Sequence, residues 1–144
     1  MARDRIGAGI LRGAIGRSWC KDTCNEPNKW SSENPAGGQC VSTALVAQDF
    51  FGGKILRLDL SRSANKRIAD VRSHYFNEID GKRIDFSASQ FSQDYFEVQQ
   101  LLQNPKNVSE VKREELLKSE DARRRYVILF VAVHKNLSKG EKKV

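Results

Sequence analysis

The sequence predicts an α+β domain in which a central apolar helix packs on a short antiparallel sheet, followed by C-terminal helices. Three observations predict this class: residues 39–51 are apolar on most sides, Asp80-Gly81 separates two short β-rich segments, and apolar residues recur at helical spacing after residue 90. A chain of 144 residues has the usual size of one domain and can bury one core. We therefore expect a single domain spanning residues 1–144.

A basic helix with one apolar face is expected at the N-terminus. Ile6, Ile10, Leu11 and Ile15 fall near helical spacing among several arginines. Arg12 interrupts the apolar stretch and no small-residue cleavage site follows, so the segment does not match an export signal. Three cysteines in a chain without such a signal do not suggest a disulfide framework. We expect a reducing, cytoplasmic location.

The predicted central helix follows a loop. Prolines, asparagines, serines and paired glycines mark the loop from Cys20 to Gly38. The helix should run from Gln39 to Phe51 and stop at Gly52-Gly53, because glycine readily adopts the left-handed conformation that ends helices.

Three strands are predicted next. Lys54 to Leu60 alternates between apolar and polar residues, and Ser61 to Asp70 is a polar loop. Val71 to Ile79 and Lys82 to Phe86 flank Asp80-Gly81, a strong hairpin-turn signal.

The rest of the chain is predicted to be mainly helical. After a turn at Ser87 to Gln90, the apolar spacing from Phe91 to Leu102 suits a helix, and Asn107 with Glu110 resembles a capping box that opens another. A last helix should start near Ser119, with Tyr126 to Val133 as its apolar part; a strand over those eight residues is the alternative.

Charge and hydropathy limit the classes of partner. The chain has 25 basic and 18 acidic residues, a net charge of +7, which favours acidic partners such as nucleic acid. The basic residues are nevertheless spread along the sequence, and the cluster Arg123 to Arg125 follows two acidic residues, so we favour a solvated helix face over a nucleic-acid site. No stretch approaches the roughly 20 apolar residues of a membrane span, so no membrane association is expected.

Cys40 is the first candidate for chemistry. It follows Gly37-Gly38-Gln39 at the predicted start of the central helix, where the helix dipole and unpaired amides stabilise a thiolate. The glycines leave room for a substrate backbone, and the Cys40 amide would face a developing oxyanion. A buried small residue at a tight turn is the alternative, since free cysteine is often buried.

A thiol nucleophile needs an imidazole, and the chain has two histidines. His74 lies early in the first hairpin strand, whereas His134 follows the last apolar run and should be exposed. With Asp80-Gly81 as the turn, facing residues sum to 161, so Asp85 becomes a diagonal neighbour of His74 on the same face. Asn77 is the alternative residue to orient the imidazole.

These segments resemble a known family. Ser18-Trp19, Trp30, Gly38-Gln39-Cys40, Thr43-Ala44-Leu45, Gln48-Asp49, Gly52-Gly53, His74-Tyr75-Phe76-Asn77, Asp85 and Gln90-Phe91 resemble the bacterial YunG-like family. The order of cysteine, histidine and aspartate is also similar to that of papain-like and transglutaminase-like proteins. The resemblance implies a papain/transglutaminase-like fold and a Cys40-His74-Asp85 triad.

The remaining candidates concern substrate and metal. Gln39 and Gly38 are predicted to contact substrate, with Asn77 beside them. Trp19 and Trp30 could line a substrate groove, although anchoring to the core is the favoured interpretation. Cys20 and Cys24 could join Cys40 and His74 around zinc, but the spacing is uncommon and would remove the triad, so neither metal nor cofactor is expected.

Two functions are consistent with these residues. The favoured hypothesis is a hydrolase or acyltransferase in which His74 deprotonates Cys40 for attack on an amide or ester of a peptide, protein or small molecule. The alternative is a catalytically inactive module that uses its basic surface to bind an acidic protein or nucleic acid.

Overall fold

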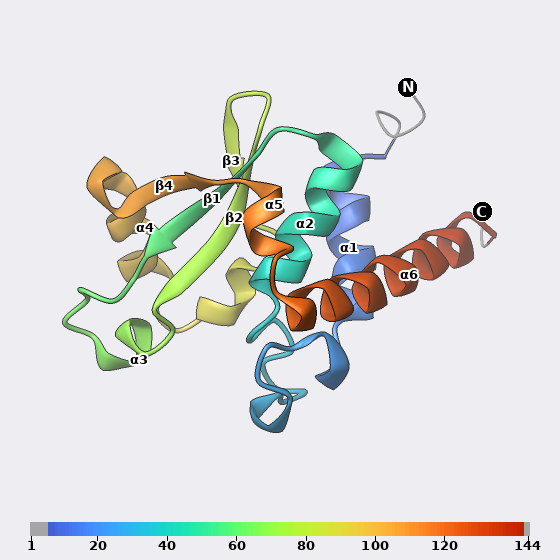
Figure 1. The fold of residues 1–144 in the computed structure, drawn as a ribbon. Coiled ribbons are helices and arrows are strands. Elements are labelled where there is room, and N and C mark those ends of the chain that lie inside the picture. The colour runs from blue at the N-terminus through green and yellow to red at the C-terminus, as the bar shows by residue number, and fades with distance from the viewer. Residues whose placement is uncertain (1–5, 143–144) are drawn as a thin grey trace.

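A four-stranded antiparallel sheet in the order β3-β2-β1-β4 forms the centre of the computed structural model, which describes residues 6–142 (Figure 1). The strands are β1 (Lys54–Asp59), β2 (Ser73–Ile79), β3 (Lys82–Ile84) and β4 (Val108–Val111). The helices are α1 (Ala8–Ser18), α2 (Cys40–Phe51), α3 (Lys66–Ala69), α4 (Tyr95–Gln103), α5 (Arg113–Leu116) and α6 (Glu120–Lys142). The predicted α+β class is confirmed.

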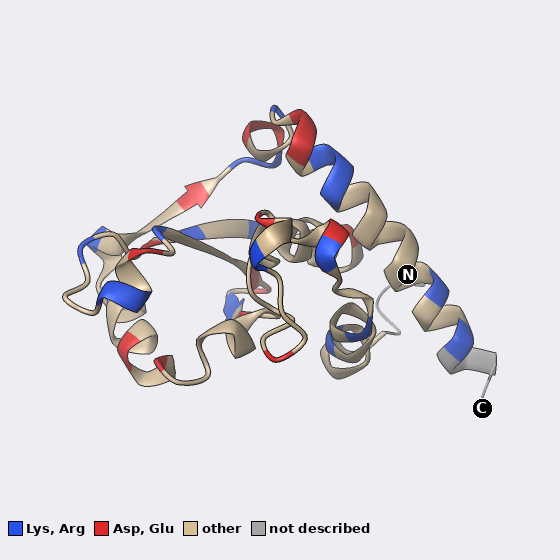
Figure 2. Ribbon diagram, turned by 90° about the horizontal axis from the view of Figure 1, so that it is seen from below, with Lys and Arg blue, Asp and Glu red and all other residues tan. Residues whose placement is uncertain are grey.

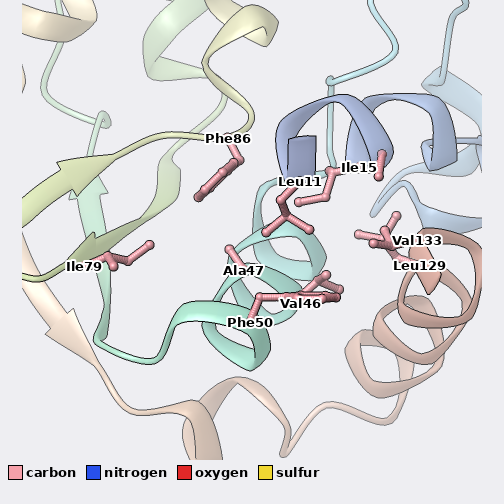
Figure 3. Close-up of a cluster of buried hydrophobic side chains, with 10 residues drawn as sticks. Leu11, Ile15, Val46, Ala47, Phe50, Ile79, Phe86, Leu129 and Val133 are labelled. Atoms are coloured by element: carbon pink, nitrogen blue, oxygen red, sulfur yellow. The ribbon is translucent and has the colours of Figure 1, made fainter. Parts of the chain in front are cut away.

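Helix α2 is the central element, between the sheet on one side and α1 and α6 on the other (Figure 1). It is buried on several sides because nearly all of its residues are apolar or small. Figure 3 shows how its side chains meet those of α1, α6 and the β2–β3 hairpin in one apolar cluster. Burial of each large apolar side chain contributes about 1.5–3 kcal/mol, so this cluster fixes α2 against the sheet. The labelled members are Leu11, Ile15, Val46, Ala47, Phe50, Ile79, Phe86, Leu129 and Val133.

The opposite face of the sheet has its own apolar cluster. Leu56 and Leu58 of β1 and Phe76 of β2 pack there against Val98 and Leu102 of α4. The paired residues Leu56 and Phe76 lie directly across from each other in the antiparallel register. The sheet is therefore covered on both faces, and both clusters help to position β2.

Two predictions for the N-terminal segment need correction or limits. Residues 1–5, part of the expected basic helix, lie outside the described residues. Ile10 was expected on the apolar face but is 63% exposed, whereas Leu11 and Ile15 are fully buried. Within residues 6–142, no helix is both long enough and apolar enough to cross a membrane.

The segment after α4 differs most from its prediction. The expected capping box at Asn107 and Glu110 is wrong, because Val108–Val111 is strand β4, paired with β1. The Asn107 side chain donates to the Leu101 carbonyl (2.9 Å) and does not cap a helix. Pairing with the otherwise open edge of β1 outweighs the local helix signal.

Three further differences are smaller. The loop expected over residues 61–70 contains α3, whose N-cap Asn65 accepts a hydrogen bond from the Arg67 amide (3.0 Å). Strand β3 ends at Ile84, two residues before the predicted end at Phe86. Tyr126 to Val133 lies inside α6, so the strand alternative there is wrong.

Candidate active site

Cys40 is the first residue of α2 and is buried, with 8% of its surface exposed. The backbone hydrogen bonds of α2 begin at Thr43, whose amide donates to the Gln39 carbonyl (3.0 Å). The amides of Cys40, Val41 and Ser42 precede it and form the positive end of the helix. The thiol therefore lies at the positive helix terminus that the sequence predicts.

The hairpin has the predicted register. Asp80 and Gly81 both have positive φ angles, 53° and 77°, as a two-residue turn of the primed type requires. Asn77 pairs with Ile84, so the numbers of facing residues sum to 161. Asp85 is thus on the same face as His74, and its Oδ2 lies 2.6 Å from His74 Nε2. The turn sets the register that places these two residues on one face of the hairpin.

Asp85 lies just beyond the end of β3, where ladder hydrogen bonds no longer hold the chain. Other contacts fix it there. The Ser87 amide donates to Asp85 Oδ1 (3.1 Å), and Arg12 of α1 donates from Nη1 to the Asp85 backbone carbonyl (2.8 Å). One carboxylate oxygen therefore binds the loop while the other binds His74.

His74 is fully buried. Burial lowers its pKa, but the hydrogen bond and charge of Asp85, together with those of Cys40, outweigh burial and raise the pKa to about 10. Among the described residues no group makes a hydrogen bond of good geometry with Nδ1. The ring nitrogen that does not face Asp85 is therefore left without a hydrogen-bond partner inside the described chain.

Two aromatic rings enclose the imidazole. The Phe91 ring meets it edge-on with centroids 4.8 Å apart, and the Phe76 ring is stacked at 6.3 Å. Both phenylalanines are buried. They exclude water from the side of the ring that faces the α4 cluster, which strengthens the interaction with Asp85.

Asn77 does not lie with this group. Adjacent strand residues point to opposite faces, so Asn77, three positions after His74, is on the other face of β2. Its Nδ2 donates to the Ala44 carbonyl of α2 (3.0 Å). Asn77 thus ties β2 to α2, and the structure does not bring it to the imidazole.

The glycines before Cys40 accommodate the chain itself. Gly38 has a φ of +75°, and a Cβ there would lie 2.5 Å from Asn25 Oδ1 and 2.6 Å from Cys24 Sγ. The space that was expected to admit a substrate backbone beside Gly38 is filled by residues 24 and 25. Gln39 is fully buried and donates from Nε2 to the Cys20 carbonyl (3.0 Å), so it anchors the preceding loop next to Cys40.

The tryptophans anchor the structure. Trp19 donates from Nε1 to Thr43 Oγ1 of α2 (2.9 Å) and packs against the central cluster. Trp30 donates to the Pro35 carbonyl (3.2 Å) within the loop.

The other cysteines and His134 stay apart from this chemistry. All three cysteines are free thiols, and the Cys24 Sγ contacts the Glu26 and Gly37 carbonyls. No cluster of three possible metal ligands occurs within residues 6–142. His134 is exposed on α6, as expected.

Three residues that contact Asp85 or His74 were not among the predicted site residues: Arg12, Ser87 and Phe91. Aspartate side chains often accept a hydrogen bond from the backbone amide two residues later. The contact between Asp85 and Ser87 could therefore be predicted from the local sequence. Arg12 is 73 residues from Asp85 and Phe91 is 17 residues from His74, and no sequence pattern links either pair.

Basic residues do not gather on one element. Figure 2 shows them on several helices and loops, with acidic residues near the start of α6. There Asp121 pairs with both Arg124 and Arg125. Arg123 and Arg124 are exposed but Arg125 is buried, so only part of the expected solvated face is present.

Comparison with known proteins identifies relatives. A family model described as YunG protein matches residues 9–138. The Uncharacterized protein YunG of Bacillus subtilis (strain 168) is 39% identical over 75 residues, which are 52% of this chain and 55% of that protein. The chain thus matches about half the length of this curated relative. No solved structure matches. The predicted resemblance to the YunG-like family is confirmed.

Proposed function

The chain belongs to the YunG protein family, and we propose that it is a cysteine-dependent hydrolase or acyltransferase acting on an amide or ester. The observation that carries the proposal is the arrangement around His74: its Nε2 lies 2.6 Å from Asp85 Oδ2, while Cys40 at the start of α2 also raises its pKa. A buried imidazole flanked by a carboxylate and a thiol at a helix N-terminus has the composition of a nucleophilic site.

The pKa of about 10 for His74 means that this imidazole keeps its proton at neutral pH. The thiolate is the form of a cysteine that attacks, and Asp85 holds the imidazolium that assists it. The Cys40 sulfur forms a bond to the carbonyl carbon, and the C=O electron pair moves to oxygen. The amides at the start of α2 stabilise this oxyanion.

Collapse of the intermediate breaks the C–N or C–O bond, and the leaving group takes the proton of His74. A thioester to Cys40 results. The neutral imidazole then accepts a proton from water or an amine, whose electron pair attacks the thioester carbon. Cys40 leaves as a thiolate and His74 is again protonated. The choice of water or amine decides between hydrolysis and acyl transfer.

We extend the proposal to the fold. A helix that begins with cysteine, followed in sequence by histidine and aspartate on a hairpin, is similar to papain-like and transglutaminase-like proteins. That resemblance supports thiol acyl chemistry with no metal or cofactor needed, and the three free cysteines fit the reducing, cytoplasmic compartment that we propose.

The test is the rate at which iodoacetamide labels each cysteine, read by mass spectrometry of digested protein. We expect Cys40 to react on the order of tenfold faster than Cys20 and Cys24. His74→Ala should remove this advantage and Asp85→Asn should reduce it. His134→Ala, which removes the exposed histidine, is the matched control. If Cys40 reacts no faster than Cys20, and His74→Ala leaves its rate unchanged, the proposal fails.

The alternative function, binding of an acidic protein or nucleic acid by the basic surface, makes a different prediction. Binding should weaken steeply with salt and should persist after Cys40→Ala. The ion pairs at the start of α6 already neutralise part of that surface, so we rank this function second.

A further inference from the structure

A surface groove of about 830 Å³ lies between the loop of residues 24–38 and the segment 89–94. Each wall includes one residue that is a neighbour of the candidate active site. Gly38, two residues before Cys40, lines one wall, and Phe91, whose ring meets His74 edge-on at 4.8 Å, lines the other. A chain lying in the groove would therefore pass between a neighbour of the proposed nucleophile and a neighbour of the proposed acid.

The polar lining of the groove is mostly uncharged. On the 89–94 wall amide and hydroxyl side chains outnumber charged ones, and on the 24–38 wall the two kinds are equal in number. Asn, Gln and Ser side chains on the two walls can each donate and accept hydrogen bonds. The groove thus offers hydrogen bonds suited to a chain that carries amide groups.

The charged lining residues are largely neutralised by each other. Lys29 pairs with Glu26 (2.9 Å), and Arg67 pairs with Asp94 (2.7 Å). Glu33 is exposed and has no ion pair within the described chain. Three carboxylates against two cations leave a net charge of −1 in the groove, on a chain whose net charge is +7. An acidic ligand finds no free cation there, whereas a cationic group finds Glu33.

We propose that this groove binds the acyl donor of the thiol reaction as an extended, amide-bearing peptide that is uncharged or basic, and that it disfavours acidic peptides. The inference rests on the proposed function, since it places this substrate class next to Cys40. The ligand that the groove favours is therefore not the acidic partner that the net charge of +7 suggests.

The experiment uses three tripeptide chloromethyl ketones that differ only in a central Lys, Gln or Glu. Alkylation joins the Cys40 sulfur to the methylene carbon and releases chloride. At low ionic strength we expect the Lys reagent to react up to about fivefold faster than the Glu reagent, the upper end of the range for a single exposed charge pair. Glu33→Lys should abolish or invert this order. Glu114→Lys, the same charge change on exposed α5, should preserve it.

A second measurement does not depend on chemistry. Tripeptide amides with the same central residues are titrated into the Cys40→Ala protein, and the amide NMR signals of Gly38 and Phe91 are followed. The Lys and Gln peptides should shift these signals at lower concentration than the Glu peptide. Shifts confined to other elements, or the same order of affinity in Glu33→Lys, would overturn the groove proposal.

The two proposals fail in different ways. If iodoacetamide labelling of Cys40 depends on His74 but neither assay shows a charge preference, the groove assignment is wrong and the thiol function stands. If labelling is independent of His74 but the Cys40→Ala protein still selects the Lys and Gln peptides at the groove, the groove stands as a binding site and the enzyme proposal fails.

Discussion

Arg12 of helix α1 donates a hydrogen bond from Nη1 to the backbone carbonyl of Asp85 (2.8 Å), and its guanidinium lies 5.0 Å from the centroid of the Phe86 ring. The first helix of the chain thus fixes the residue that binds the His74 imidazole. Because β3 ends at Ile84, no hydrogen bond of the β2–β3 ladder holds Asp85 in place. Arg12 is therefore a positioning residue in the proposed site.

Arg12→Ala should loosen Asp85 and weaken its bond to His74. We expect the His74 pKa, followed by NMR of the ring, to fall from about 10 toward 6.5. Cys40 alkylation at neutral pH should slow on the order of tenfold, a size typical of small misplacements in a site. Arg17→Ala changes an exposed arginine of the same helix and should alter neither quantity. If Arg12 had only a structural role, Arg12→Ala would lower the free energy of unfolding and leave the His74 pKa unchanged.

Asn77→Ala separates a structural from an orienting role. Loss of the buried bond from Asn77 to the Ala44 carbonyl should lower the free energy of unfolding by about 1–3 kcal/mol. Cys40 alkylation in the folded variant should match the wild-type rate. Asp85→Asn should show the reverse pattern, with a larger effect on the rate. A rate loss in Asn77→Ala without destabilisation would restore Asn77 as the orienting residue.

Gly38→Ala tests the backbone that leads to Cys40. A Cβ there meets Asn25 and Cys24, and the φ of +75° is strained for alanine. We expect urea unfolding to show a loss on the order of 1–3 kcal/mol. Gly9→Ala places the same methyl group in open space on helix α1 and should stabilise by about 0.5–1 kcal/mol. Equal effects of the two changes would refute the close approach at Gly38.

The pH dependence of stability tests His74 directly. Its pKa is raised from an ordinary 6.5 to about 10 in the folded protein, so between these values His74 carries a proton in the folded state that it lacks in the unfolded state. The stabilising contribution is therefore complete below about pH 6.5 and is lost as pH rises through 10, with a slope of at most about 1.4 kcal/mol per pH unit. His74→Gln should remove this slope, measured by urea unfolding from pH 6 to 10. A slope unchanged in His74→Gln but lost in His134→Gln would contradict the assignment.

Local signals account for much of the fold and for the central pair of the site. The apolar run from Cys40 to Phe51 and the glycine after it define α2, and Asp80-Gly81 defines the hairpin together with its register. That register places Asp85 on the same face as His74, so these two residues could be paired from sequence. Strand β4 could not be predicted, because its partner is an edge of β1 about 50 residues earlier in the chain.

The sequence by itself determined which residue types stand at the helix start and on the hairpin, because turn geometry and apolar periodicity act over a few residues. Only the tertiary structure decided what surrounds them. It turned Asn77 to the α2 side of the sheet, filled the space at Gly38 with Cys24 and Asn25, and brought Arg12 across 73 residues to Asp85. These contacts depend on how α1, α2 and the sheet pack, and burial of the shared apolar cluster fixes that packing.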